Sequence, residues 1–148
     1  MRKVIYTLCI LSVVILSGYL YIDNQPVKVI DIKPDQYAPV VIVDRLPFSA
    51  TAKIKWWNSE SGEILKKYNL SVNNSLANKN FYIYEFGEGY QEPGEKDRLC
   101  FPDIESPSNC LDKNILMIVR YRSNGLIQFD IGDDAYVSDD KGKIKPVD

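Results

Sequence analysis

The first 22 residues contain the feature that most limits how this chain can fold, a long apolar run behind two basic residues. Residues 4–22 carry no charged side chain, and Arg2 and Lys3 precede them. At about 1.5 Å per residue, a helix over this run would be roughly 28 Å long, which matches the hydrocarbon thickness of a bilayer. No polar face interrupts the run, as a helix packed on a soluble core would require. The sequence therefore predicts a transmembrane helix.

Two export signals compete with this interpretation. A cleaved signal peptide has a short apolar segment and small residues at its cleavage site. Here Leu16 occupies one of the positions that favour a small residue, and the apolar run continues past Gly18 to Ile22. A lipoprotein would need a cysteine directly after Gly18, where Tyr19 stands. We therefore expect an uncleaved signal anchor.

The charges beside the run predict its orientation. The basic pair lies on its N-terminal side and Asp23 follows it, so the positive-inside rule places the N-terminus in the cytoplasm. The expected organisation is a cytoplasmic tip and transmembrane anchor over residues 1–22, followed by a single periplasmic domain over residues 23–148. The protein would then sit in the inner membrane and contact the lipid bilayer through residues 4–22.

Composition excludes several classes of function. The 148-residue chain has no histidine, which rules out His-dependent triads, histidine general bases and histidine metal sites. Its formal net charge is −2 without a basic patch, which argues against nucleic-acid binding. We find no nucleophile paired with a base, so we expect no enzyme, no catalytic residue, no metal site and no cofactor.

Two motifs with chemical associations have simpler explanations. Gly87–Tyr90 is rich in glycine, but no Lys-Ser/Thr pair follows it and the neighbouring glutamates would repel a phosphate. Asp130, Asp133 and Asp134 lack the spaced oxygen ligands and the glycine of an EF-hand loop. We expect a plain loop at the first motif and a solvated turn at the second.

Three cysteines divide between the anchor and the exported part. Cys9 lies within the apolar run, whereas Cys100 and Cys110 enclose a proline-rich segment. In an oxidising compartment this pair predicts a disulfide. A redox pair would favour C-x-x-C spacing, and a zinc site would need two further ligands. Asp97 and Arg98 precede Cys100, and we expect them to form a local ion pair that orients the disulfide loop.

Residues 23–148 are expected to form an α+β domain, a small antiparallel sheet packed by one main helix. Alternating and β-branched patterns predict strands over residues 27–32, 39–43, 81–86, 115–122, 126–131, 135–138 and 143–147. One helical face contains Ile54, Trp57, Ser61, Ile64 or Leu65, and Tyr68. Ser49 or Thr51 can cap this helix, and Ser61-Gly62 weakens its middle.

The hairpin around residues 123–125 allows its register to be predicted. A two-residue turn would mix apolar and polar residues on each face, whereas a three-residue loop gives one apolar face with Gly125 at positive φ. The pairs then expected are Tyr121 with Ile127, Val119 with Phe129, and Met117 with Ile131. The helix should pack on this face, which predicts a core of Ile54, Trp57, Leu65, Tyr68, Met117, Val119, Tyr121, Ile127 and Phe129.

Several blocks of the chain resemble a known family. They are Ala52–Trp57, Leu65–Tyr68, Phe86-Gly87 with Gly89-Tyr90, Asp97–Phe101 and Asn109–Asn114. Together with the anchor, they are similar to the enterobacterial putative membrane protein family catalogued as domain-of-unknown-function family nine-four-three. The resemblance covers nearly the whole chain, and the double Trp and the two Cys blocks are its most specific parts. It implies an inner-membrane protein with no assigned activity, so it transfers no catalytic residue.

The disulfide loop is the place where we expect a partner to bind. The bridge would display Phe101, Asp103, Ile104 and Glu105 as a rigid, partly apolar tip, and rigidity lowers the entropy lost on binding. The alternative is that the bridge only stabilises a modest core.

Two functions follow from these features. The first is an envelope protein that binds another protein in the periplasm, with an immunity-type inhibitor of a toxin acting there as its specific form. The second is a structural or assembly subunit of an inner-membrane complex. The anchor has no strong small-xxx-small motif and no charged residue, which weakens the second function.

Overall fold

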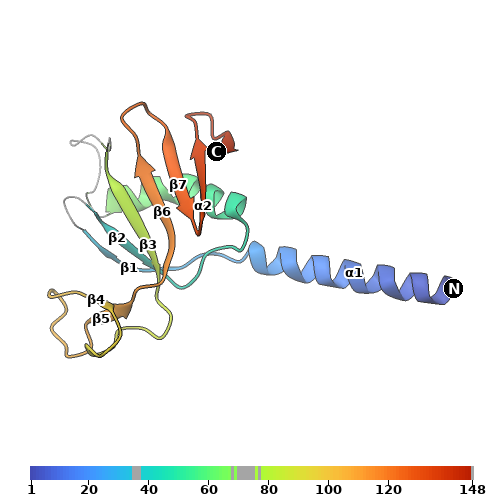
Figure 1. Cartoon of the computed structure of the whole chain (residues 1–148), viewed down its shortest axis with the longest axis horizontal. Coiled ribbons are helices and arrows are strands. Elements are labelled where there is room, and N and C mark those ends of the chain that lie inside the picture. Colours follow the sequence, from blue (N-terminus) through green and yellow to red (C-terminus); the bar gives the residue numbers. More distant parts are fainter. Residues whose placement is uncertain (35–37, 68, 70–75, 77, 148) are drawn as a thin grey trace.

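The computed structural model describes residues 1–34, 38–67, 69, 76 and 78–147 (Figure 1). Within these residues the helices are α1 (Arg2–Asp23) and α2 (Ala50–Lys67). The strands are β1 (Val29–Lys33), β2 (Val40–Val43), β3 (Asn80–Glu85), β4 (Arg98–Cys100), β5 (Cys110–Asp112), β6 (Ile115–Tyr121), β7 (Ile127–Ile131), β8 (Asp134–Ser138) and β9 (Ile144–Pro146).

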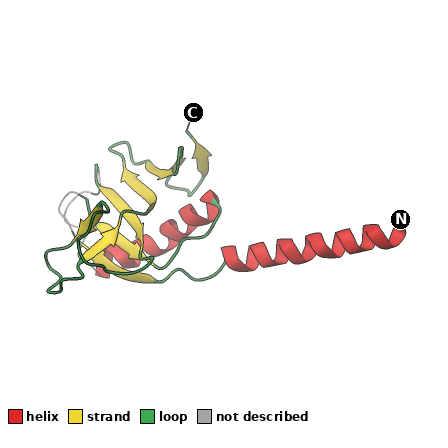
Figure 2. Ribbon diagram, turned by 60° about the horizontal axis from the view of Figure 1, so that its bottom comes forward, coloured by secondary structure: helices red, strands yellow, loops and turns green. Residues whose placement is uncertain are grey.

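Helix α1 projects away from the rest of the molecule as a single rod, as both views show (Figures 1 and 2). None of its residues is buried, and it is long and apolar enough to cross a membrane. Its polar side chains bond within the helix: the Thr7 hydroxyl donates to the Lys3 carbonyl and the Ser12 hydroxyl to the Cys9 carbonyl. These internal bonds suit a hydrocarbon environment, where no water can satisfy a hydroxyl group.

The main sheet has seven strands in the order β1-β2-β3-β6-β7-β8-β9. Its pairs are antiparallel except for β2 and β3, which run parallel. The sheet is thus mostly antiparallel, as predicted, and this one parallel pair is the feature that the prediction did not include. The reason is that α2 lies between β2 and β3 in the chain and returns it to the end of the sheet where β2 began, which is the connection that parallel strands need.

The predicted hairpin register is confirmed for its first two pairs. Strands β6 and β7 pair Tyr121 with Ile127 and Val119 with Phe129. Gly125 has φ 81°, as the three-residue loop requires. The ladder ends at the pair Ile118 and Asp130, before the third predicted pair. The final hairpin of β8 and β9 also forms, with β9 inside its expected segment and β8 beginning one residue earlier than expected.

Helix α2 covers one face of the sheet and is continuous through Ser61-Gly62. Trp57 is 0% exposed, and its indole N–H donates to the Tyr121 hydroxyl at 3.2 Å. This core contains the predicted residues Ile54, Trp57, Leu65, Met117, Val119 and Phe129, with Tyr121 and Ile127 partly buried against them. Tyr68, also placed in the core by the sequence, lies outside the described residues.

A smaller apolar cluster lies on the other face of the sheet. Side chains alternate along a strand, so Ile42 points away from the core that Val41 and Val43 enter. Ile42 and Tyr84 pack there against Phe101 and Leu111. The latter two belong to residues 86–114, the segment with the short sheet β4-β5, which we call the disulfide lobe.

Candidate functional site: the disulfide lobe

A disulfide between Cys100 and Cys110 joins the two strands of the lobe, as predicted. The two cysteines are direct partners in the ladder of β4 and β5. On the other side of β5, the Gln91 N–H donates to the Cys110 carbonyl at 2.7 Å, and the Gln91 carbonyl accepts the Cys110 N–H at 2.9 Å. The backbone of Cys110 is thus held from both sides, and the covalent bond lies within a hydrogen-bonded frame.

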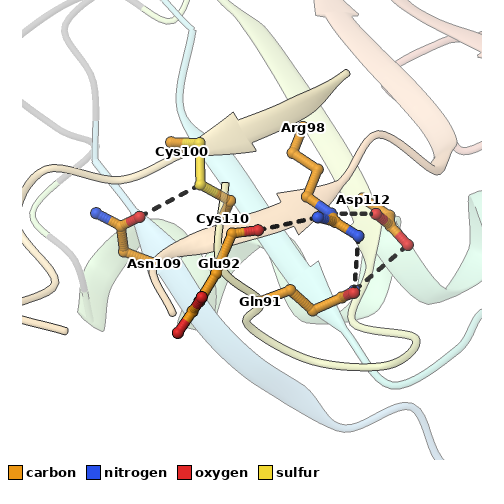
Figure 3. A network of polar contacts seen from close by, with 7 residues as sticks. All are labelled: Gln91, Glu92, Arg98, Cys100, Asn109, Cys110 and Asp112. Atoms are coloured by element: carbon orange, nitrogen blue, oxygen red, sulfur yellow. Dashed lines mark hydrogen bonds and ion pairs between the residues drawn. A yellow bond between two sulfur atoms is a disulfide. The ribbon is translucent and has the colours of Figure 1, made fainter. Parts of the chain in front are cut away.

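Arg98 joins three parts of the lobe through its guanidinium group, which Figure 3 shows. Its Nε donates to Asp112 Oδ1 at 2.8 Å, and its other nitrogens donate to the Glu92 carbonyl and to Gln91 Oε1, both at 2.9 Å. The Arg98 side chain is 13% exposed, so these bonds are largely shielded from water. The hydrogen bond from Arg98, with a second from Gln91, lowers the pKa of Asp112.

The expected ion pair between Asp97 and Arg98 does not form. Arg98 pairs with Asp112 instead, and Asp97 accepts a bond from Lys113 Nζ at 2.7 Å. Both pairs therefore cross from the β4 side of the lobe to the β5 side. Neighbouring residues of an extended chain point in opposite directions, which keeps adjacent charges apart and makes cross-strand partners available.

The side chain of Phe101 is buried between the lobe and the main sheet. This differs from the sequence prediction, in which the disulfide displays the aromatic ring on an exposed tip. Phe101 is 6% exposed and belongs to the small cluster with Ile42 and Tyr84. Its ring packs edge-on against Tyr90, with centroids 6.1 Å apart, and lies 5.4 Å from Lys33 Nζ. The sheet face under the lobe needs an apolar cover, and Phe101 provides it.

A row of polar groups joins the lobe to strand β1. The Tyr90 hydroxyl donates to Asp31 Oδ2 at 2.8 Å, and Lys33 Nζ lies 3.1 Å from the same oxygen. Lys33 Nζ also donates to Asp103 Oδ2 at 2.8 Å. The sequence suggested none of these residues except Asp103, because the contacts join segments about 60 to 70 residues apart that no local pattern relates.

The pKa values of this row follow from its contacts. Partial burial would raise the pKa of Asp31, but the bonds from Tyr90, Lys33 and the Ile32 N–H outweigh burial and lower it. Partial burial would lower the pKa of Lys33, but the carboxylates of Asp103 and Asp31 raise it. Burial, followed by the bond to Asp31, raises the pKa of Tyr90. Near neutral pH the Asp31 carboxylate and the Lys33 ammonium group are therefore charged, and the Tyr90 phenol is neutral.

With Phe101 buried, the predicted binding residues that form the tip of the lobe are Asp103, Ile104 and Glu105. Asp103 and Glu105 are exposed, while Ile104 is partly buried against the small cluster. The turn is closed by the Ile104 N–H donating to the Phe101 carbonyl at 3.1 Å. The tip lies at the end of the domain opposite α1, as Figure 1 shows.

Of the three aspartates flagged near the end of β7, Asp133 and Asp134 are exposed, and Asp130 is engaged in structural contacts. Asp130 accepts a bond from Arg120 Nε at 2.6 Å and another from the Gln128 amide. Within residues 1–34, 38–67, 69, 76 and 78–147, no group of three or more His, Cys, Asp or Glu side chains could hold a metal ion. The lobe thus presents an acidic, solvent-exposed surface that is held in place by the disulfide and by the hydrogen bonds of Arg98.

Comparison with known proteins tests the resemblance noted in the sequence. A family model described as "Enterobacterial putative membrane protein (DUF943)" matches residues 1–148. Comparison with curated proteins and with solved structures gives no match. The family match confirms the expected resemblance, and it agrees with an N-terminal helix able to span a membrane. The chain therefore belongs to the DUF943 family of enterobacterial membrane proteins.

Proposed function

We propose that this is a single-pass inner-membrane protein whose periplasmic domain binds another protein through the disulfide lobe. In this proposal α1 is an uncleaved anchor with its N-terminus in the cytoplasm. The observation that carries the proposal is the concentration of acidic charge on a rigid lobe at the end of the domain away from α1.

The net negative charge of residues 23–148 comes from the lobe. Residues 86–114 contain seven acidic and three basic residues, a net charge of −4. The rest of residues 23–148 contains 13 acidic and 13 basic residues and is neutral. Such a separation is not needed for solubility, but it guides an oppositely charged surface to one end of the molecule. The partner should therefore present a basic surface.

The frame of the lobe also favours binding. The disulfide, the Arg98 bonds and the seated Phe101 ring fix the backbone under the tip before any partner arrives. A surface ordered in advance loses less conformational entropy on association. Ile104 can contribute an apolar contact between Asp103 and Glu105, as in interfaces where a small apolar centre is surrounded by charges.

An immunity-type inhibitor is the specific form that we propose. Such a protein needs an anchor in the compartment where the toxin acts, and a surface that covers a functional site of the toxin. It needs no catalytic group of its own, and we propose that this chain is not an enzyme. The function as an assembly subunit receives less support, because α1 has neither charged residues within the run 4–22 nor small residues at the spacing that favours helix association.

The binding proposal can be tested by photocrosslinking in intact cells. A benzoylphenylalanine placed at the exposed Ser106, beside the tip, should give one discrete adduct, while the same probe at exposed Lys141 should not. The double change Asp103→Lys and Glu105→Lys should reduce the adduct at least tenfold. The matched control is Glu60→Lys with Glu63→Lys on exposed positions of α2, which alters the net charge equally. Adducts that respond equally to both double variants would exclude recognition by the lobe.

The identity of the adduct separates the two functions. A toxin whose gene lies beside this one, and against which the chain protects cells, would support the immunity-type role. A resident subunit of an envelope complex would support the assembly role instead. Topology is a separate test: alkaline phosphatase fused after residue 148 should be active, and carbonate washing should not release the protein. A released product that begins near Tyr19 would contradict the retained anchor.

A further inference from the structure

The last residue of α1 is bonded to the first turn of α2. Asp23 Oδ1 accepts the backbone N–H groups of Phe48 and Ser49 at 2.6 and 3.2 Å, and Asp23 Oδ2 accepts the Ser49 hydroxyl at 3.0 Å. Ser49 Oγ in turn accepts the Ala52 N–H at 3.2 Å, which makes Ser49 the N-cap of α2. A carboxylate at a helix N-terminus is stabilised by the free N–H groups there. The folded domain is therefore fastened to the end of the membrane helix.

This connection places Phe48 beside the membrane helix. The rings of Phe48 and Tyr19 stack with centroids 6.2 Å apart and an interplanar angle of 20°. Tyr19 precedes Asp23 by four residues, so it lies about 6 Å back along the helix axis, toward the bilayer. Phe48 is nevertheless 60% exposed in the isolated chain. A large aromatic ring is thus held, mostly uncovered, at the depth where aromatic residues mark the boundary between membrane and water.

Two cations flank this ring. Arg45 and Lys53 line a groove of about 340 Å³ together with Phe48 and Ile22 from α1. Lys53 Nζ donates to the Phe48 carbonyl at 3.1 Å, which holds its charge next to the ring. Arg45 is exposed, and its guanidinium group forms no ion pair with any residue that the structure describes.

The same groove contains one carboxylate, that of Glu85. This carboxylate accepts a hydrogen bond from the Asn114 amide. Of the charged residues that line the groove, two are cations and one is a carboxylate that already has a partner, and Asp23, which interacts with Lys53, adds a second partnered carboxylate beside it. An apolar ring between positive side chains is the arrangement expected at a lipid headgroup region with phosphate groups.

We infer that this face of the domain, formed by Arg45, Phe48 and Lys53, lies on the periplasmic leaflet of the membrane that α1 spans. Phe48 enters the interface beside Tyr19, and the two cations contact lipid phosphates. The bilayer is the occupant because the face is continuous with α1 and lies at the depth of its last turn. The inference depends on the retained anchor of the proposed function, but not on partner binding.

Contact with the membrane at this face would fix the orientation of the domain, in addition to the tether that α1 provides. Helix α2 begins at the membrane face and carries the chain away from it, and the disulfide lobe lies at the far end of the domain (Figure 1). A domain held at both Asp23 and Phe48 cannot rotate freely about a flexible stalk. The acidic tip would then point away from the membrane, toward partners in the periplasm.

Spin-label accessibility in vesicles tests the inference on the full chain. In a Cys9→Ala background, the label is attached to Phe48→Cys, with Val13→Cys in the middle of α1 and Val147→Cys at exposed β9 as references. The vesicles contain phosphatidylcholine and phosphatidylglycerol at 3:1. At position 48, collisions with oxygen should exceed those with a polar nickel complex several-fold relative to position 147. Position 13 should show a still larger ratio.

The reference positions separate the possible failures. A water-like ratio at position 48 with a membrane-like ratio at position 13 would overturn the docked face and leave the anchor and the lobe's function intact. A water-like ratio at position 13 would overturn the spanning helix, and the docked face with it. A label at position 48 that is shielded from both reagents would mean that protein covers this face, which also contradicts lipid docking.

A second variant tests the cations without changing Phe48 further. Arg45→Glu with Lys53→Glu should lower the oxygen-to-nickel ratio at position 48 at least twofold in these vesicles. Lys141→Glu with Lys145→Glu makes the same change of charge at exposed positions on the C-terminal hairpin and should leave the ratio unchanged. Equal ratios for the two double variants would overturn the contact with lipid phosphates.

Discussion

The two faces of the main sheet are held by different forces. On one face, α2 and the sheet bury 13 apolar side chains in a continuous core that includes Trp57 and Phe129. On the other face, among the residues that the structure describes, the sheet and the disulfide lobe each contribute two buried side chains to the smaller cluster, and a disulfide with two sets of polar contacts fixes the lobe in place. Apolar packing has no preferred direction, whereas hydrogen bonds and a disulfide do. We therefore expect reduction or acid to loosen the lobe while the α2 face stays folded.

Trp57→Ala should have the largest effect, because it removes the largest fully buried side chain of the α2 face. Truncation of a buried tryptophan leaves a cavity and costs about 3–5 kcal/mol, close to the whole stability of a small domain. The Tyr121 hydroxyl also loses its donor. Urea unfolding of the full chain in detergent, followed by near-UV circular dichroism, measures this loss.

The neighbouring residue provides the control. Trp56 is only partly buried and lines an open groove near Asn24 and Lys55, so Trp56→Ala should cost much less. If Trp57→Ala cost less than about 1 kcal/mol, the α2 face would not be a packed core and Trp57 would be available for another role.

Loss of the disulfide should rank second and should act on the lobe. Closing a loop of about 11 residues stabilises a protein by roughly 2.5–3 kcal/mol in the chain-entropy model. Pro102 and Pro107 already restrict the unfolded loop, which reduces this figure. In Cys100→Ser with Cys110→Ser, amide hydrogen exchange should accelerate in β4 and β5 while the amides of α2 keep their protection.

The bridge itself is checked by alkylating thiols with and without reductant. Protein isolated from cells without reductant should expose no reactive thiol at positions 100 and 110 until it is reduced. Free thiols at both positions would mean that no covalent bond holds the lobe, so only its polar contacts would distinguish it from the α2 face. Equal acceleration of exchange on both faces in the double variant would show that the two faces unfold as one unit.

Arg98→Ala should follow, with a loss of about 1–2 kcal/mol, because it leaves Gln91 and Asp112 without their shared donor. Asp97→Ala is the matched control. Its carboxylate is 84% exposed and pairs with Lys113, so its loss should cost less than about 0.5 kcal/mol. Thermal unfolding of both variants measures the difference, and equal losses would contradict the role of Arg98 as the polar centre of the lobe.

The same contrast explains what the sequence could predict. The apolar helix α1, the β6-β7 register and the helix α2 follow from patterns within short segments, and the structure agrees with them. The parallel pairing of β2 with β3 was missed because an apolar strand carries no mark of its direction. Strands β4 and β5 were treated as a loop because three-residue strands give no periodic pattern.

The candidate site was predicted less completely than the fold. The pairing of Cys100 with Cys110 could be predicted from the number and positions of the cysteines, since the third one, Cys9, lies in the apolar helix α1. The burial of Phe101 and the contacts of Tyr90 with Asp31 depend on how the lobe folds back over the sheet. Such contacts are properties of the tertiary structure, and no local spacing encodes them.

The smallest expected effect is a dependence of the lobe on pH through Asp31. Its pKa in the folded protein lies below the ordinary 3.8, because the bonds from Tyr90 and Lys33 outweigh partial burial. The stabilisation is therefore complete above the unfolded pKa and is lost as the pH falls through the lower folded pKa. Wild-type protein should lose this contribution below about pH 4, the range where an unfolded carboxyl group takes up a proton. Because the carboxylate is partly exposed, the effect should stay below about 1 kcal/mol.

Asp31→Asn removes this proton-linked step and should flatten the acid side of the stability curve between pH 5 and 2. The reference is Asp140→Asn, at an exposed position of the C-terminal hairpin, which should keep the wild-type slope. Urea midpoints measured at intervals over this range give both slopes, with hydrogen exchange at Gln91 and Cys110 to localise the change to the lobe. If Asp31→Asn kept the wild-type slope, the contact between β1 and Tyr90 would not hold the lobe in solution. The lobe would then be held by its disulfide and by the hydrogen bonds of Arg98, and the polar contact with β1 would not contribute to its stability.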